Sequence, residues 1–412
     1  MAGRDEMEAL KHSVVVVGAG AAGLVAAAFA ATAGAKVTLI ERTKDGGRKI
    51  LISGGGRCNV LPSVATPERF VTGSPPHLLR AMLRSWPLHE QRTFFEDDLG
   101  IPLVLEEESG KLFPRSNRAR DVRDALVTFA GARGADLQFG ATVTNVSRAA
   151  RGFAVETSAG TIACDRVVLA TGGLSVPATG SDGIGLRIAQ ALGHDLVDTY
   201  PALAPLLAGD ARHAALSGVS LEVRLRSKDG SRSIETRGGF LFTHRGYSGP
   251  SVLDISHVTA RGETASAGKP AIRVQWAAVD DQELLAGSGD SVAVILSRHI
   301  PARLAEQLMI ECGIPFDRRT SSLKRAERVA LVEALTSYPL PWSGNEGYKK
   351  AEVTGGGVRL ADVDPKTLES RKVEGLYLCG EMLDAFGPIG GHNFSWAWST
   401  GRAAGIAAGA RA

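Results

Sequence analysis

The sequence contains few cysteines, and none of them are paired in a motif. Its 412 residues include four, and no two of them form a C-x-x-C pair: Cys58, Cys164, Cys312 and Cys379. This spacing excludes a disulfide framework, a zinc site built from cysteine pairs and a dithiol redox centre. A reducing compartment fits this usage best, so we expect a cytoplasmic protein.

The chain also lacks a large excess of charge of one sign. Its net charge is only +3, and its Lys and Arg residues are spread along the sequence. We therefore expect a small-molecule substrate, with neither nucleic acid nor a membrane surface as partner. Residues 1–11 are polar and carry no signal-peptide core, which predicts a frayed extension. The length allows two or three domains.

Glycine, in contrast, is abundant, and one glycine turn organises the N-terminal part. Val14–Val17 is a β-branched run suited to a buried strand, and Gly18-Ala19-Gly20-Ala21-Ala22-Gly23 follows it directly. The alanine-rich stretch 24–33 then predicts a helix. A second strand is expected at 36–40 and ends at Glu41.

Each part of this unit suits a dinucleotide. Gly18 permits the tight turn, Gly20 lets the backbone approach a pyrophosphate, and Gly23 lets the helix pack against the strand. The helix N-terminus offers N–H groups to the phosphates, and Glu41 would accept from the ribose hydroxyls. The order of these elements predicts a dinucleotide site, with an ordinary glycine-rich βαβ turn as the alternative.

A second glycine-rich stretch follows at 42–59. It contains Gly46-Gly47-Arg48-Lys49 and Ser53-Gly54-Gly55-Gly56-Arg57-Cys58-Asn59. A loop this rich in glycine loses much backbone entropy when it is ordered, so we expect a bound flat ring system to hold it. A flexible surface loop is the alternative. Cys58 would then be either a thiol beside that ring or a small buried residue.

The remaining pattern predicts one domain inserted into another. Helices are expected at 75–86, 88–99 and 118–133, a strand pair at 103–105 and 111–113, a three-stranded meander over 141–162, a strand at 166–169 and a helix from Asp182-Gly183 to 192. From about Asp195 the pattern is β-rich, and it turns helical between 301 and 337. Strand 375–378 and helix 394–408 would complete the first sheet. The predicted domains are 12–194 with 351–412, and 195–350 with a helical insertion near 280–338.

Several of these segments together resemble a known class of proteins. The Gly18 fingerprint, Ala170–Gly173 and Gly380–Gly391 resemble FAD flavoproteins of the glutathione-reductase and fumarate-reductase type. Four longer motifs are similar to bacterial flavoproteins of the aminoacetone oxidase family, which includes 3-dehydro-bile-acid reductases: Ile52–Asn59, Leu241–Pro250, Val353–Val358 and Gly391–Trp398. His392 stands where we expect Tyr in relatives. The resemblance implies an α/β fold, namely a Rossmann-like FAD-binding domain with an inserted β-rich domain carrying a small helical subdomain.

The resemblance also implies the cofactor, FAD, and its contacts. Asp384 would bind on the ribityl or phosphate side, and Gly391–Phe394 would place a helix N-terminus at the flavin N1 and C2 carbonyl, where it would stabilise reduced flavin. With the glycine turn, the complete predicted set of cofactor-binding residues is Gly18, Gly20, Ala22, Gly23, Glu41, Arg42, Arg48, Ser53, Gly54, Gly55, Arg57, Cys58, Asn59, Thr171, Gly172, Asp182, Gly183, Gly380, Glu381, Asp384, Gly391, His392, Asn393 and Phe394.

Three functions compatible with FAD remain open. The first is an NAD(P)H-linked reductase of an activated C=C or carbonyl-type small molecule, the second an O2-dependent oxidase of a small amine such as aminoacetone, and the third a flavin-binding redox module without turnover. The middle domain should cover the reactive face of the flavin. His244 is then the leading proton donor, unless it is a structural histidine, and Tyr247 is the second candidate. No second complete G-x-G-x-x-G is present, so NAD(P)H would bind transiently.

Overall fold

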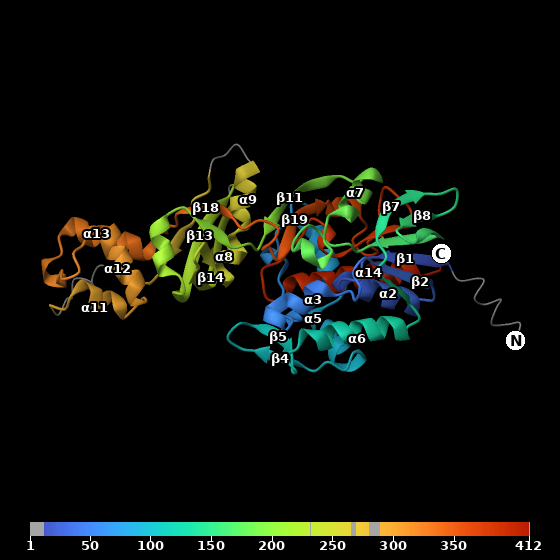
Figure 1. Ribbon diagram of the computed structural model, residues 1–412, viewed down its shortest axis with the longest axis horizontal. Helices are drawn as coiled ribbons and strands as arrows, with labels where there is room; N and C mark the ends of the chain where they lie inside the picture. The colour runs from blue at the N-terminus through green and yellow to red at the C-terminus, as the bar shows by residue number, and fades with distance from the viewer. Residues whose placement is uncertain (1–11, 231, 265–268, 280–288, 412) are drawn as a thin grey trace, which may run out of the picture. The chain divides into compact units, whose positions relative to one another are not determined.

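The computed structural model describes residues 12–230, 232–264, 269–279 and 289–411. They form two compact units, which Figure 1 draws as ribbons. Unit 1 contains the chain up to Tyr200 and again from Val353, and unit 2 is Pro201–Glu352. The sequence predicted boundaries at 194/195 and 350/351. The expected frayed extension at 1–11 and the part of the helical insertion at 280–288 lie outside the described residues.

A five-stranded parallel sheet forms the centre of unit 1. Its strand order is β20-β10-β1-β2-β6, with bounds Leu376–Leu378, Arg166–Leu169, Ser13–Val17, Lys36–Glu41 and Asp136–Phe139. Val14–Val17 of the central strand are at most 3% exposed, as a strand covered on both faces requires. The predicted completion of the sheet by a strand near the C-terminus is confirmed, whereas the edge strand β6 was not predicted.

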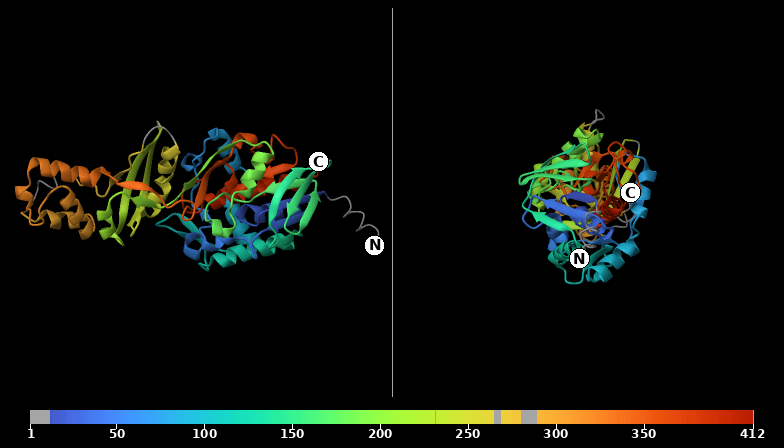
Figure 2. Two further views of the ribbon diagram at one scale, coloured as in Figure 1. Left: turned by 45° about the horizontal axis from the view of Figure 1, so that its top comes forward. Right: turned by 90° about the vertical axis from the view of Figure 1, so that its right-hand side faces the viewer.

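Two long helices of unit 1 pack unusually closely. Helices α2 (Ala21–Thr32) and α14 (His392–Gly409) lie side by side in Figure 1 and Figure 2. Three glycines at four-residue intervals make this possible, since they share one face of α14: Gly401, Gly405 and Gly409. A Cβ atom on any of them would lie 2.4 Å from a carbonyl oxygen of α2. The helix that ends the chain is therefore pressed against the helix that follows the first glycine turn.

We expect Gly405→Ala to destabilise the protein although alanine is the better helix former. The helix propensity favours Ala by about 1 kcal/mol, but overlap with the Ala26 carbonyl oxygen should outweigh it and leave a net loss of about 2 kcal/mol. Gly131→Ala in α6 (Ala119–Ala132) is the matched control, because its Cβ would lie 3.9 Å from Leu137, an ordinary contact. Urea unfolding of both variants tests this. Equal stability of the two would contradict the close packing.

The other elements of unit 1 include the predicted helices, strand pair and meander, and some elements that were not predicted. They are α3 (Arg48–Ile52), α4 (Pro76–Arg84), α5 (Leu88–Thr93) with a π turn to Asp98, the sheet β3-β5-β4 (Leu61–Pro62, Lys111–Pro114, Leu103–Glu106), the meander β7-β8-β9 (Val143–Arg148, Phe153–Thr157, Gly160–Cys164), α7 (Ile184–Ala191) and the pair β11-β19 (Leu196–Ala202, Val353–Val358). One expectation needs correction, because stretch 42–59 is not all loop. It contains α3 and a 3-10 turn at Ser53–Gly56.

Unit 2 is built on a seven-stranded antiparallel sheet with a helical part. The strand order is β17-β16-β13-β14-β15-β12-β18, with bounds Tyr338–Pro339, Arg273–Gln275, Ser220–Asp229, Arg232–Phe242, Gly246–Ser248, Leu206–Ala208 and Trp342–Asn345. The predicted hairpin turn at Asp229-Gly230 is confirmed. The helices are α8 (Pro250–Ile255), α9 (His257–Thr264), α11 (Val292–Ser297), α12 (Ala302–Glu311) and α13 (Arg325–Thr336). No helix of the described chain has the length and apolar character needed to cross a membrane.

Candidate FAD site

The first glycine turn packs closely on one side and is open on the other. Gly18 donates its N–H to the Ile40 carbonyl at 2.8 Å, and a Cβ on Gly18 would lie 2.7 Å from the Ala170 carbonyl oxygen. A Cβ on Gly23 would lie 1.8 Å from the Gly18 oxygen, so neither position admits a side chain. At Gly20, in contrast, no described atom lies within 4 Å of the Cβ position. The turn is therefore open where a pyrophosphate is expected to approach.

Glu41 fixes the same turn through both carboxylate oxygens. Oε2 accepts a hydrogen bond from the Ala19 N–H at 2.8 Å, and Oε1 accepts one from the Thr43 N–H at 2.7 Å. The sequence predicted a contact with the ribose, but it gave no hint of this structural role. Because each carboxylate oxygen can accept a second hydrogen bond, Glu41 can hold the turn and a ribose hydroxyl together.

A hydrogen-bonded cluster joins the ends of β10 and β20. Lys49 Nζ lies 2.6 Å from Glu381 Oε2 and also donates to Ser175 Oγ at 2.6 Å. Ser175 donates to Glu381 Oε1 at 2.6 Å, and the Thr354 N–H donates to the same oxygen at 3.0 Å. Glu381 was predicted, whereas Lys49, Ser175 and Thr354 were missed. The position of Lys49 after the Gly46-Gly47 pair, next to the predicted Arg48, was the available signal.

The other charged residues of the predicted set form ion pairs close by. Arg48 pairs with Asp45 at 3.1 Å, between Nε and Oδ1. Arg42 pairs with Asp182, and so links the end of β2 to the turn that starts α7. Next to Gly183, the Asp182 carboxylate also accepts the Ile184 N–H at 3.1 Å. These contacts bring the predicted residues after β2 and β10 together at one edge of the sheet.

The glycine-rich segment after α3 adopts a backbone that few residues tolerate. Gly54, Gly55, Gly56 and Cys58 all have positive φ angles, between 55° and 88°. Burial raises the pKa of the Cys58 thiol to about 12, so the thiol stays protonated and unreactive at neutral pH. Arg57 lies over the Phe113 ring and pairs with Glu106 at 3.1 Å. Asn59 Oδ1 is buried and has no described hydrogen-bond partner.

The start of α14 supplies a buried histidine. His392 Nδ1 lies 3.3 Å from the Ile389 carbonyl oxygen, to which it donates, and Nε2 is buried with no described partner. Burial, and secondarily the Arg69 charge, lowers the pKa of His392 to about 4. The ring is therefore neutral, and the Val64 backbone as well as the Ile389 backbone lies within reach of it. The buried Asn59 acceptor and the open side of the glycine turn fit a large ligand that carries its own donors.

We expect the pKa of His392 to make stability sensitive to acid. In the unfolded chain a histidine titrates near 6.5, so this group favours folding above that pH, and its contribution is lost as pH falls toward 4. Between pH 8 and pH 5 the loss should be about 2 kcal/mol. Urea unfolding of the wild type and of His392→Phe at both pH values measures it as a difference. Equal acid sensitivity of the two proteins would contradict the buried neutral ring.

Three further residues of the predicted cofactor-binding set form hydrogen bonds or ring contacts within the protein. The buried Asp384 Oδ2 accepts hydrogen bonds from the Gly73 N–H at 2.9 Å and from the Thr72 and Ser74 hydroxyls at 3.3 Å. The Asn393 amide bonds both the N–H and the C=O of Gly387, each at 2.9 Å. Phe394 stacks on Trp398 with ring centroids 5.3 Å apart. Direct contact of these residues with the cofactor stays a prediction.

The two predicted proton donors belong to unit 2 and differ in environment. His244 is exposed, in the turn between β14 and β15. Tyr247 is fully buried, and its hydroxyl lies 2.7 Å from His213 Nδ1 and donates to the Pro341 carbonyl at 3.0 Å. Burial raises the pKa of Tyr247. Of the two, only His244 presents its side chain to solvent.

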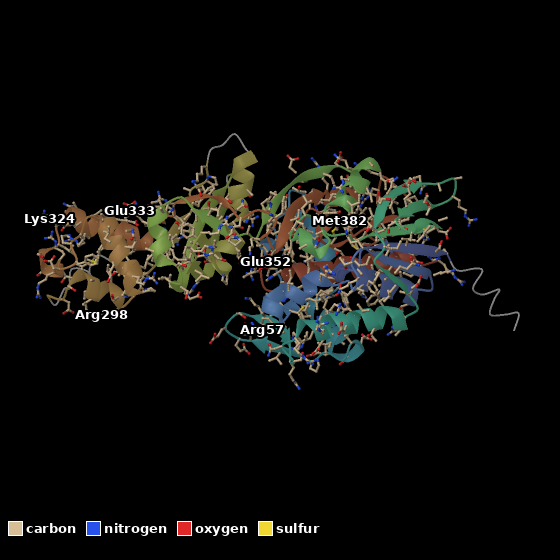
Figure 3. The ribbon with its side chains drawn as sticks, viewed as in Figure 1. Arg57, Arg298, Lys324, Glu333, Glu352 and Met382 are labelled. Atoms are coloured by element: carbon tan, nitrogen blue, oxygen red, sulfur yellow. The ribbon has the colours of Figure 1, made fainter. Side chains whose placement is uncertain are left out.

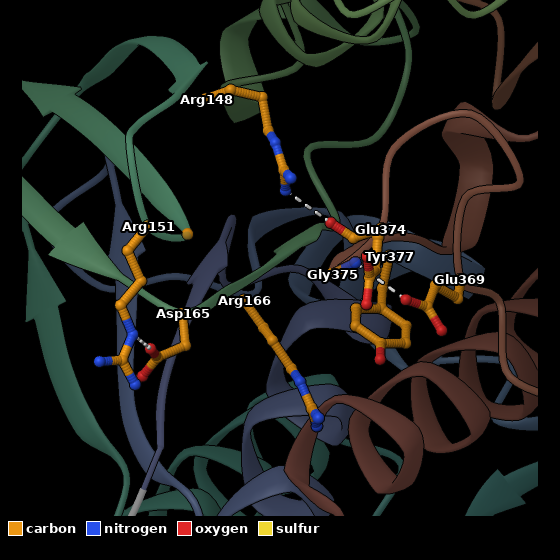
Figure 4. A pocket seen from close by; sticks show the side chains of 9 residues that line it. Arg148, Arg151, Asp165, Arg166, Glu369, Glu374, Gly375 and Tyr377 are labelled. Atoms are coloured by element: carbon orange, nitrogen blue, oxygen red, sulfur yellow. Dashed lines mark hydrogen bonds and ion pairs between the residues drawn. The ribbon is translucent and has the colours of Figure 1, made fainter. Parts of the chain in front are cut away.

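Unit 1 also has a polar pocket of about 380 Å³ at the opposite edge of the sheet (Figure 4). It lies where β10 and β20 begin, whereas ligands of such folds bind beyond the carboxyl ends of the strands. Arg148 donates to the Glu374 carbonyl at 2.8 Å, and Arg166 donates to the Ala408 carbonyl at 3.0 Å. With three arginines balanced by Asp165, Glu369 and Glu374, the pocket is not an anion site.

Comparisons with known proteins agree with this picture. The chain is 34% identical over 395 residues to the "Ribosomal RNA dihydrouridine synthase" of Escherichia coli K12, covering 95% of this chain and 96% of that protein. It is 31% identical to the "3-dehydro-bile acid delta(4,6)-reductase" of Clostridium scindens, covering 97% and 100%. The structure of a 3-ketosteroid-delta4-(5alpha)-dehydrogenase from Rhodococcus jostii RHA1 has the same fold, with a TM-score of 0.51, 17% identity and 97% coverage of both chains.

These findings confirm the predicted fold and enzyme class, a Rossmann-like FAD-binding domain with an additional β-rich domain in an FAD-dependent oxidoreductase. The narrower resemblance to aminoacetone oxidases stays a prediction. The profile of one family, described as "HI0933-like protein Rossmann domain", matches residues 12–407. Since that match spans nearly the whole sequence, the chain belongs to the HI0933-like family.

Proposed function

We propose that this enzyme reduces a C=C bond conjugated to a carbonyl group, and that its substrate is a uridine base in ribosomal RNA. The proposal rests on one observation: the names of two relatives describe reactions at the same kind of bond. Dihydrouridine is uridine reduced at the C5=C6 bond, which is conjugated to the C4 carbonyl. A delta(4,6)-reductase of a 3-dehydro-bile acid likewise acts on double bonds conjugated to a ketone. The two substrates differ in size, but the chemistry required is the same.

This substrate departs from our expectation that nucleic acid is not a partner. That expectation rested on the net charge of +3 for the whole chain, which says nothing about how charge is distributed over the folded surface. Sequence identity favours ribosomal RNA over a bile-acid-like substrate. The relatives named "Ribosomal RNA dihydrouridine synthase" from E. coli and Haemophilus influenzae are each 34% identical to this chain, against 31% for the bile-acid reductase.

Bound FAD would supply the hydride that adds to the carbon β to the carbonyl, after reduction by a donor that we propose to be NAD(P)H. The residues of this chain would bind and orient FAD. Its pyrophosphate and adenosine ribose would lie at Gly18–Gly23 and Glu41, and another part of the cofactor would lie at the start of α14. The protein also has to protonate the α carbon, since hydride addition leaves negative charge there. A proton donor must therefore face the substrate.

We propose His244 for this proton transfer, because its imidazole is exposed and histidine is the side chain that most often transfers protons in catalysis. His244→Ala should lower kcat by about 10²- to 10⁴-fold and leave the flavin content unchanged. His213→Gln is the control, since it removes a buried histidine from the same unit. Single-turnover oxidation of the reduced enzyme by substrate measures the step. An unchanged rate for His244→Ala would remove this residue from the mechanism.

The substrate proposal is tested by incubating the yellow protein anaerobically with NADH or NADPH and protein-free ribosomal RNA. Digestion and mass spectrometry should show dihydrouridine formed in proportion to donor consumed. If reduced enzyme is instead reoxidised by a steroidal dienone and not by RNA, the enzyme is a small-molecule reductase. Bleaching by aminoacetone, with neither nicotinamide effective, would support an amine oxidase and contradict the proposal.

A further inference from the structure

We infer that the helical part of unit 2 binds the sugar–phosphate backbone of RNA through a surface around the start of α13. This inference rests on the proposed RNA substrate, but its own basis is the charge distribution. Residues 316–328 contain five basic residues, Arg318, Arg319, Lys324, Arg325 and Arg328, and two acidic ones, Asp317 and Glu327. Their excess of three positive charges equals the net charge of the whole chain. The remainder of the chain is therefore electrically balanced.

Three of these cations have no carboxylate partner among the described residues. Glu327 is occupied, since it pairs with Arg318 at 3.2 Å and accepts the Lys324 backbone N–H at 2.9 Å. Lys324 and Arg325 are exposed, and no carboxylate of the described residues lies within ion-pair distance of either. Arg319 donates to the Gly289 carbonyl at 2.7 Å and has no carboxylate partner in the part of the chain that the structure describes. We call Arg319, Lys324 and Arg325 the α13 basic surface, and Figure 3 labels Lys324 on this helical part.

Several other arginines of unit 2 form ion pairs. Arg224 and Arg226 on β13 flank Glu235, with N–O distances of 3.4 and 2.8 Å. Arg298 pairs with Asp290 at 2.8 Å, and Arg245 pairs with Glu346 at 2.9 Å. Since these charges are neutralised locally, they attract a polyanion weakly. The α13 basic surface instead groups three cations without a described carboxylate partner within seven residues of sequence, and phosphate groups are the complementary partner.

An exposed aromatic ring accompanies the cations. Phe316 is 51% exposed, two residues before the arginine pair Arg318-Arg319. Exposed Phe beside Arg and Lys is the combination with which proteins hold unpaired RNA, because the cations contact phosphates while the ring stacks on a base. A purely electrostatic surface would not need the ring. The occupant is therefore RNA with at least one unstacked base, and the surface would hold the substrate outside the FAD site.

The test is RNA binding by the full-length, flavin-loaded protein, measured by fluorescence anisotropy with a labelled, protein-free ribosomal RNA fragment between 50 and 200 mM KCl. Lys324→Ala with Arg325→Ala should weaken binding about tenfold or more at the lowest salt, and should reduce the slope of log Kd against log [KCl] by about 1.4 to 1.8. Arg224→Ala with Arg226→Ala removes the same charge from β13 and should leave both quantities unchanged. Lys324→Arg should bind like the wild type.

Phe316→Ala separates stacking from charge. It should weaken binding by about fivefold or more at every salt concentration and leave the slope unchanged. Flavin content and the rate of reduction by nicotinamide should be normal in all variants. The inference is overturned if the wild type does not bind RNA, if it binds anionic vesicles or an acidic protein in preference, or if the α13 and β13 double variants behave alike.

The outcome also separates this inference from the substrate proposal. If the wild type binds RNA through the α13 basic surface but forms no dihydrouridine, the binding surface stands and the proposed reaction fails. If dihydrouridine forms at the same rate in wild type and in the α13 double variant at limiting RNA, the reaction stands and the binding surface fails.

Discussion

Replacing Gly20 with valine is expected to give a folded but colourless protein. Gly20 has φ −78° and ψ −170°, an extended conformation that valine adopts without strain, and its Cβ would meet no described atom within 4 Å. The fold therefore tolerates the change. The added side chain would occupy the open side of the turn and keep a pyrophosphate away from the backbone N–H groups. Loss of two charge-assisted hydrogen bonds costs about 4 kcal/mol, or about a thousandfold in FAD affinity.

Two other glycines serve as controls for this result. Gly23→Ala should fail to fold, because its Cβ would lie 1.8 Å from the Gly18 carbonyl oxygen. Gly131→Val, in ordinary contact with Leu137, should fold and remain yellow. Circular dichroism and the flavin-to-protein absorbance ratio distinguish the three outcomes. A Gly20→Val protein with stoichiometric flavin would show that the cofactor does not lie against this turn.

The helices and strands could be predicted from the sequence where the residue types allow few backbone conformations. Four consecutive valines, a glycine turn and an alanine-rich helix fit a buried strand followed by a close helix packing, and the structure has β1 and α2 there. Strand β20 was found for the same reason, since an apolar run ends at a glycine. Strand β6 was missed because Asp136–Phe139 is an edge strand without a buried apolar pattern.

The cofactor crevice was less predictable, because its contacts join residues far apart in sequence. Lys49, Ser175 and Glu381 form one hydrogen-bonded cluster, but no local pattern links three residues that belong to different turns. The same holds for the glycines of α14. Gly401, Gly405 and Gly409 look like weak points of a helix until α2 is placed against them. Sequence patterns indicate which backbone can approach a ligand, and packing decides which side chains meet there.

Glu41→Leu is expected to affect both folding and FAD binding, which distinguishes it from Gly20→Val. Leucine has a similar volume but no acceptor, so the Ala19 and Thr43 N–H groups would lose their partners. The two lost hydrogen bonds to a charged group should lower the free energy of unfolding by about 3 kcal/mol. Because the Ala19 N–H belongs to the glycine turn, FAD affinity should fall by at least about a hundredfold as the turn loosens and the ribose loses its acceptor.

Urea unfolding of flavin-free protein and fluorescence titration with FAD measure the two effects separately. Glu41→Gln should lie between leucine and the wild type, since an NH2 group, which cannot accept, replaces one of the two oxygens that accept from these N–H groups. Glu107→Leu removes the same charge from an exposed position between β4 and β5 and should change neither quantity. A Glu41→Leu protein with wild-type stability but weak FAD binding would show that Glu41 contacts the ribose and does not stabilise the turn. Lower stability with normal FAD binding would show that Glu41 only stabilises the turn. FAD would then be bound at this end by the backbone alone.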